Sequence, residues 1–257
     1  MHSTAPRTAR SWVRPISGRT EPGALRLFCF PYAGAGASVF RAWGAELPED
    51  VQAFAVQLPG REDRFSDRPI TDLDELLDAL LPALLPYLDR PFAFFGHSVG
   101  AIVSWELARR LQREQGVEPV RMMVSGCRAP SVHESREPGE LDLSDEELIN
   151  ELRRLNGTPE ELLQNPDFAA FILPTVRADL SLFARYAYRP GESLTCPVSV
   201  FGGDADPRVA EEHLERWAEL TTGRTEVEVF PGGHFFLNEE REAVLRSVSR
   251  ALRAVGR

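Results

Sequence analysis

The stretch FAFFGHSVGA, residues 92–101, joins a short apolar run to the start of a helical pattern. Ser98 stands between Gly96 and Gly100 at the point where the two patterns meet. One explanation is a tight loop that needs small residues. The other is a serine at the tip of a sharp strand-to-helix turn, which would expose its hydroxyl at the edge of a sheet. The rest of the chain decides between them.

The apolar runs of the chain alternate with helical patterns, and each run is soon followed by glycine or proline. Such alternation predicts an α/β fold with a mostly parallel central sheet and helices on both faces. The predicted helices span 71–88, 99–114 and 237–255, and Thr71 is the expected cap of the first. Pro82 and Pro86 should kink or split that first helix. The predicted strands are residues 25–30, 51–56, 92–95, 120–125, 197–201 and 225–230.

Composition narrows the class of protein. The chain has 257 residues, 43% of them hydrophobic, and a net charge of −10. An acidic chain does not favour nucleic acid as a partner, because phosphate binding needs a basic surface. No apolar run approaches the ~18 residues of a membrane span, and residues 1–23 lack the apolar core of a secretory signal. The three cysteines show no metal or disulfide spacing, so we expect a cytoplasmic protein.

Two segments depart from the alternation. Residues 1–24 are rich in Ser, Thr, Pro and Arg and are expected to form an N-terminal arm before a single domain at 25–257. Residues 126–196 contain no good strand but three helix starts. These are capping boxes at Ser144 and Thr158, and Asn165 before a proline; Pro174 should interrupt the third helix. This helical insertion predicts a lid at about residues 134–190, some of whose apolar side chains could line a channel for an acyl chain.

A serine hydroxyl needs a general base and donors for the oxyanion before it can act as a nucleophile. In chains with a G-x-S-x-G turn, the base follows the acid in chain order. His2, His97, His133 and His213 do not occupy a suitable position. His234 follows the apolar run 225–230 in PGGH, at the carboxyl end of a predicted strand. We therefore expect Ser98 as nucleophile and His234 as base.

Two aspartates compete for the acid, because the run 197–201 ends in GGDADP. Gly203 and Asp206 have the usual G-x-x-D spacing, so we favour Asp206 over Asp204; for either, a turn or a helix cap is the structural alternative. Backbone N–H groups of Val99 and Ala33 are the expected oxyanion donors. A phosphate-binding loop at residues 31–36 is disfavoured, because the glycine spacing and the Lys-Ser/Thr pair of such loops are missing.

These patches together resemble the type II thioesterases of polyketide and nonribosomal peptide biosynthesis, which have the α/β-hydrolase fold. The resemblance covers nearly the whole chain from Trp12 onward, and P-x-A-G and P-G-R are its most specific elements. The residues that carry it are FPYAGAGAS (30–38), VQLPGREDR (56–64), RPFAFFGHSVGA (90–101), FGGDADP (201–207) and FPGGHFFL (230–237).

The resemblance implies a triad of Ser98, Asp206 and His234, oxyanion donors Ala33 and Val99, and a helical lid. It implies hydrolysis of acyl groups from the phosphopantetheine thiol of acyl or peptidyl carrier proteins, and of small acyl thioesters, which clears misprimed or stalled synthases. No metal or dissociable cofactor is expected, since the substrate carries the phosphopantetheine. We expect a monomer that binds neither nucleic acid nor membrane.

Other functions remain open at this point. The same residues would serve a chain-releasing thioesterase, a stand-alone carboxylesterase or an acyltransferase. A binding module with an idle triad is a further alternative. The carrier-binding surface is also open: Arg61 and Arg64, or Arg109, Arg110 and Arg113, could meet an acidic carrier, although solvated surface charge is the simpler explanation.

Overall fold

The computed structural model describes residues 12–16, 25–133, 135 and 143–256. The expectations that concern His2 and the other residues of 1–11 and 17–24 fall outside this range. So do residues 134 and 136–142 of the expected lid.

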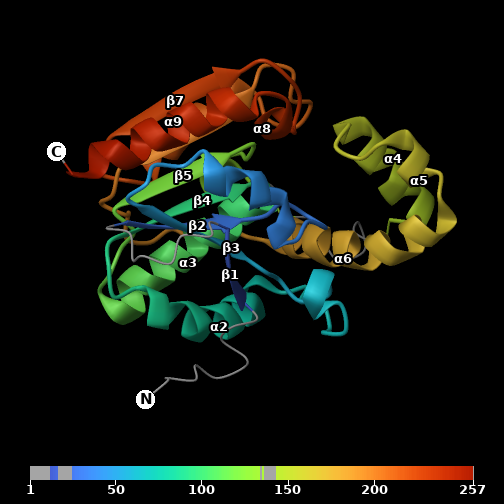
Figure 1. Cartoon of the computed structure of the whole chain (residues 1–257), viewed down its shortest axis with the longest axis horizontal. Helices are drawn as coiled ribbons and strands as arrows, with labels where there is room; N and C mark the ends of the chain where they lie inside the picture. Colours follow the sequence, from blue (N-terminus) through green and yellow to red (C-terminus); the bar gives the residue numbers. More distant parts are fainter. Residues whose placement is uncertain (1–11, 17–24, 134, 136–142, 257) are drawn as a thin grey trace.

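The described residues form one seven-stranded sheet in the order β1-β3-β2-β4-β5-β6-β7 (Figure 1). All neighbouring strands are parallel except β1, which runs antiparallel to β3. This confirms the predicted α/β fold with a mostly parallel sheet. The strands are β1 (Val13–Pro15), β2 (Leu25–Phe30), β3 (Val51–Val56), β4 (Phe92–His97), β5 (Arg121–Ser125), β6 (Val198–Gly203) and β7 (Thr225–Phe230).

Strand β1 belongs to the stretch that was predicted as an arm. Val13 pairs with Val56 at the edge of the sheet, and both Trp12 and Val13 are buried. The Arg64 guanidinium lies 4.0 Å from the centre of the Trp12 ring, a cation–π contact that fixes the same segment. Three residues are too few to show the alternation of apolar and polar residues that identifies a strand, so β1 was not predicted from the sequence.

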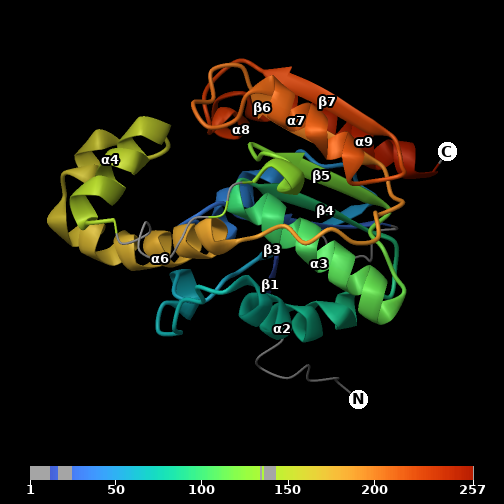
Figure 2. The ribbon, with the colours of Figure 1, turned by 180° about the vertical axis from the view of Figure 1, so that it is seen from behind.

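Helices cover both faces of the sheet, as predicted. The apolar sides of α2, α3 and η6 pack in one cluster that includes Trp105 and Trp217. Those of η1 and α9 pack in a second cluster on the opposite face, around Phe40 and Trp43 (Figures 1 and 2). The helices are η1 (Ala37–Ala45), η2 (Glu62–Arg64), α2 (Leu73–Leu84), η3 (Leu85–Tyr87), α3 (Val99–Gln115), η4 (Pro130–Val132), α7 (Glu211–Glu215), η6 (Arg216–Glu219), α8 (Phe236–Glu239), α9 (Arg241–Arg253) and η7 (Ala254–Gly256).

Three further helices form what we call the α4–α6 segment: α4 (Asp145–Leu155), α5 (Glu160–Leu163) and α6 (Pro166–Arg185). Figures 1 and 2 show α4 and α5 standing away from the sheet, connected to it by the long α6. The segment has a small apolar cluster of its own, which contains Leu148, Leu173 and Val176. Its helices pack on one another through this cluster, and Leu182 of α6 joins the segment to the main core.

Three predictions about helix ends and continuity are wrong, whereas the capping box at Ser144 is confirmed. Helix α2 is capped by Asp72 rather than Thr71, and α5 begins after Pro159 with no cap from Thr158. Helix α6 runs through Pro174 without interruption. A proline within a helix costs about 3 kcal/mol, so packing of buried neighbours on either side of it must offset that loss.

Candidate active site

Ser98 sits at the turn between β4 and α3 with φ 54° and ψ −120°. This sparsely populated conformation costs about 1–3 kcal/mol and persists only where the surroundings enforce it. A Cβ added to Gly96 would lie 2.3 Å from the Gly100 carbonyl oxygen, and one added to Gly100 would lie 2.3 Å from the Phe30 carbonyl oxygen. Both glycines are therefore required by the close approach of neighbouring backbone.

His234 and Asp206 lie beside Ser98, although they are far from it in the sequence. His234 follows β7 and Asp206 follows β6. Nε2 of His234 is 3.0 Å from Oγ of Ser98, and Nδ1 is 2.8 Å from Oδ2 of Asp206. A carboxylate only accepts hydrogen bonds, so Nδ1–H donates to Asp206 and Nε2 accepts the hydroxyl proton of Ser98. The side chains of His234 and Asp206 are 3% and 0% exposed.

The two aspartates that competed in the sequence have different partners. Asp206 Oδ1 accepts the backbone N–H of Arg208 at 2.8 Å, which leaves Oδ2 for the imidazole. Asp204 Oδ1 accepts the backbone N–H of Gly232 at 2.9 Å and so ties the loop after β6 to the loop after β7. The structure thus brings Asp206 to His234 and gives Asp204 a role in a turn.

His97 is buried next to the site, with its ring centre 5.2 Å from that of His234. Its Nδ1 is 2.9 Å from the Ser125 hydroxyl oxygen. Burial, together with the neighbouring His234, holds the pKa of His97 well below its usual 6.5. We therefore expect a neutral His97 ring that packs beside His234.

The expected oxyanion donors belong to two backbone segments that approach each other beside Ser98. Val99 is the first residue of α3, where backbone N–H groups have no partner within the helix. Ala33 lies in the turn after β2, and the pairing of Phe30 with Gly96 places the ends of β2 and β4 side by side. No hydrogen bond from the N–H of Ala33 or Val99 is found among the described residues.

Arg61 is not on a surface that could meet a carrier. It is buried, 4% exposed, and its guanidinium forms an ion pair with Asp179 on α6. Arg64 is also largely covered, with a side chain 10% exposed that pairs with Asp67. The ion pair with Asp179 could not be read from the sequence, because no pattern links positions so far apart in the chain.

A cavity of about 640 Å³ lies between the strand ends and the α4–α6 segment. Ser98 and His234 line it from the sheet side. Four arginines and two glutamates make its wall strongly charged; the sequence did not single them out as cavity residues. They are Arg128, Arg154, Arg177, Arg208, Glu147 and Glu151.

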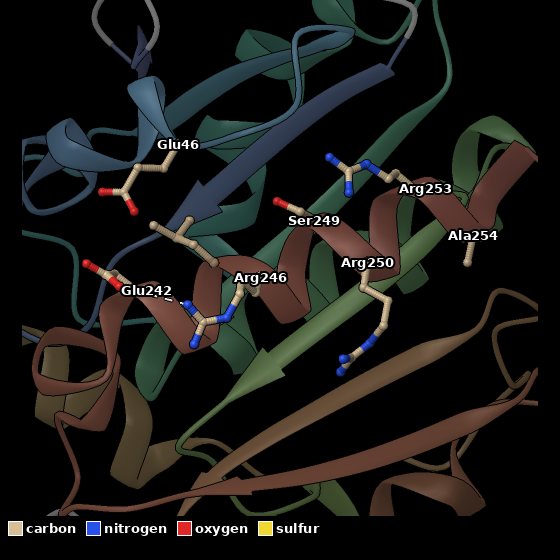
Figure 3. Close-up of a pocket in the computed structure, with 8 residues that line it drawn as sticks. Glu46, Glu242, Arg246, Ser249, Arg250, Arg253 and Ala254 are labelled. Carbon is tan, nitrogen blue, oxygen red and sulfur yellow. Dashed lines mark ion pairs between the residues drawn. The ribbon is translucent and has the colours of Figure 1, made fainter.

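A larger cavity, about 830 Å³, runs along the outer side of α9 (Figure 3). Its charged side chains include Glu46, Glu242 and Arg246, and Glu242 pairs with Arg246. It shares no lining residue with the cavity that holds Ser98, and no histidine lines it to serve as a base. The chemistry therefore belongs to the smaller cavity.

Comparison with known proteins identifies relatives along nearly the whole chain. A family model described as a thioesterase domain matches residues 25–252. The gramicidin S biosynthesis protein GrsT of Aneurinibacillus migulanus is 42% identical over 231 residues, 90% of each chain. The thioesterase PikA5 of Streptomyces venezuelae is 38% identical, over 93% of this chain and 84% of that protein.

Solved structures agree with this. The structure of BorB, a type II thioesterase from the borrelidin biosynthetic cluster, superposes with a TM-score of 0.86 at 38% identity, covering 94% of this chain and 98% of that one. RedJ, a thioesterase from the prodiginine pathway of Streptomyces coelicolor, gives a TM-score of 0.84 at 36% identity, covering 93% and 96%.

Proposed function

Because this chain belongs to the thioesterase family, among the type II thioesterases of polyketide and nonribosomal peptide pathways, we propose that it hydrolyses acyl groups from the phosphopantetheine thiol of carrier proteins. The observation that carries this proposal is the hydrogen-bonded chain from Ser98 through His234 to Asp206, open to a cavity. We further propose that the enzyme edits misprimed or stalled synthases, as the resemblance to type II thioesterases implies.

In the proposed mechanism, Ser98 Oγ attacks the thioester carbonyl carbon while His234 Nε2 takes the hydroxyl proton. The N–H groups of Ala33 and Val99 stabilise the oxyanion that forms. The carbon–sulfur bond then breaks, and the pantetheine thiol leaves with the proton from His234. A thiol of pKa about 8.5 needs less help from an acid than an amine does. Water, deprotonated by His234, hydrolyses the acyl-serine and restores the enzyme.

The cavity fits a substrate of this kind on two grounds. It lies between the strand ends and the α4–α6 segment, so that segment would act as a lid over the acyl group. Its four arginines would attract an anionic partner such as an acidic carrier with a phosphopantetheine arm. The cellular location that we propose, the cytoplasm, is an expectation from the sequence. None of the helices in the described part of the chain is long and apolar enough to cross a membrane.

The test is mass spectrometry of a carrier protein loaded with a panel of acyl groups, before and after exposure to the enzyme. We expect the wild type to remove several short acyl groups and Ser98→Ala to remove none. Ser104→Ala is the matched control, since Ser104 is a buried serine of α3 that bonds the Ala101 carbonyl.

Three outcomes would contradict the proposal. Full turnover by Ser98→Ala would remove the triad from the mechanism. A strong preference for matched oxygen esters would favour a carboxylesterase, and release of one mature chain alone would favour a chain-releasing enzyme.

A further inference from the structure

A buried ion pair joins the α4–α6 segment to the loops beside the active site. Arg61 follows β3, and Asp179 lies on α6. Nη1 of Arg61 is 2.5 Å from Oδ2 of Asp179, and Nη2 is 2.8 Å from Oδ1, so the contact is bidentate. Both side chains are only 5% exposed. A pair this deeply buried loses the hydration of both charges, so stability alone is a weak reason for it.

The same two side chains hold the turn after β2. Asp179 Oδ2 accepts the backbone N–H of Gly34 at 2.8 Å. Arg61 Nη1 donates to the carbonyl oxygen of Ala35 at 3.2 Å. The turn is therefore held at the N–H of Gly34, directly after Ala33, and at the carbonyl of Ala35, one residue further on.

Helix α6 also fits this turn sterically. Gly34 has φ +76°, and a Cβ there would lie 2.5 Å from Cγ2 of Val176. Gly60, the residue before Arg61, has φ +85°, and its Cβ would lie 3.1 Å from Cγ2 of Thr175. A short stretch of α6 thus carries both Asp179, which bonds Gly34, and the side chains of Thr175 and Val176, which pack against the two glycines.

We propose that Arg61 and Asp179 are positioning residues for the oxyanion donor at Ala33, an inference that rests on the proposed function. The peptide between Ala33 and Gly34 is planar, so anchoring the Gly34 N–H fixes one side of Ala33. With that anchor, the Ala33 N–H stays aimed at the site of the oxyanion. The position of α6, and with it the α4–α6 segment, sets the geometry of the oxyanion hole.

The decisive variant replaces both partners with apolar residues, as Arg61→Met/Asp179→Leu. Such replacements of a buried pair are often neutral or stabilising, so this variant is expected to fold. It leaves the Gly34 N–H without its acceptor. The single change Asp179→Asn is the second variant, and it removes the negative charge while keeping the shape.

The matched control is Glu106→Gln. Glu106 on α3 pairs with Arg109 and accepts the Tyr186 hydroxyl at 2.6 Å, at the end of α6 but away from the turn. It therefore disturbs a partly buried carboxylate–arginine pair next to α6 without releasing Gly34.

Two quantities are measured: steady-state turnover of a short acyl-pantetheine thioester, and affinity for an alkyl trifluoromethyl ketone. The ketone forms a tetrahedral oxyanion on Ser98, so its affinity reports on the oxyanion hole. We expect the double variant to lose about 10- to 100-fold in kcat and in ketone affinity, with little change in KM. Asp179→Asn keeps an oxygen that can accept the Gly34 N–H, so it should lose less than the double variant. The control should keep both values, whatever its melting temperature.

Wild-type kcat and ketone affinity in a folded double variant would overturn the inference. A loss in Glu106→Gln equal to that in the double variant would do the same, since it would reduce the effect to stability. Failure of the proposed function gives a different result: turnover by Ser98→Ala, regardless of positions 61 and 179.

Discussion

At the scale of single residues, Asp204 and Asp206 differ in their hydrogen-bond partners. Asp206 bonds His234, whereas Asp204 bonds the backbone of a loop. We predict that Asp206→Asn lowers kcat by about 10³- to 10⁴-fold, because the amide cannot hold the Nδ1–H tautomer of His234. Asp204→Asn keeps an oxygen that can accept the Gly232 N–H, so its kcat should stay near that of the wild type. Steady-state kinetics on one thioester compares the two. Similar losses would mean that the acid is not Asp206.

The buried imidazole of His97 gives a prediction about pH. Because burial lowers the pKa of His97 below 6.5 in the folded protein, the unfolded chain takes up a proton at a higher pH than the folded one does. Its contribution to stability is complete above about pH 6.5 and is lost as the pH falls below that value. His97→Asn should remove a slope of up to ~1.4 kcal/mol per pH unit there. Urea unfolding from pH 7.5 to 5 measures both slopes, and equal slopes would contradict this.

At the scale of elements, the close contact of β2, β4 and α3 sets the turn at Ser98. Gly100→Ala places a Cβ against the Phe30 carbonyl, so we predict a loss of about 3 kcal/mol in the free energy of unfolding. Gly116→Ala, at the far end of α3, meets nothing within 4 Å and has only its φ of +66° against it, which costs about 1 kcal/mol. Urea unfolding distinguishes the two. Equal losses would show that the close contact is not required.

The sequence was informative where one local signal decides the structure. Ser98, Asp206 and His234 each follow an apolar strand at a glycine-rich turn, so their meeting at one sheet edge followed from the order of strands. The length of helix α6 was harder to predict from the sequence, because Pro174 indicates a break and only tertiary packing keeps the helix continuous there. The Arg61–Asp179 pair could not be predicted, since the α4–α6 segment has to fold back before the two residues meet.

At the scale of the whole molecule, the net charge of the protein is negative, but four arginines line the cavity that contains Ser98. The net charge is −10, and the four arginines are Arg128, Arg154, Arg177 and Arg208. Glu147 and Glu151 line the same cavity, and Glu151 pairs with Arg154 and Arg208, so the wall keeps a modest excess of positive charge. We propose that this excess guides the approach of an acidic carrier. The cavity wall also replaces Arg61 and Arg64, which are covered, as the expected region of contact.

Reversing one exposed charge tests that region. We predict that Arg154→Glu lowers kcat/KM for an acyl-carrier substrate by about fivefold at low salt, corresponding to ~1 kcal/mol for one charge near a surface. Turnover of a small thioester should be nearly unchanged, and salt should reduce the difference. Arg224→Glu is the control, because Arg224 is exposed before β7 and does not line the cavity. Equal effects on both substrates, or of both variants, would contradict the prediction.

The central claim is that the hydroxyl of Ser98 accepts the acyl group. Rapid-quench peptide mass spectrometry, with an acyl-carrier substrate in excess, measures this directly. The account predicts a transient acyl mass on the peptide that contains Ser98, formed before the free acid accumulates and lacking in Ser98→Ala. Free acid released at the wild-type rate with no adduct on that peptide, or an adduct on another residue, would contradict it.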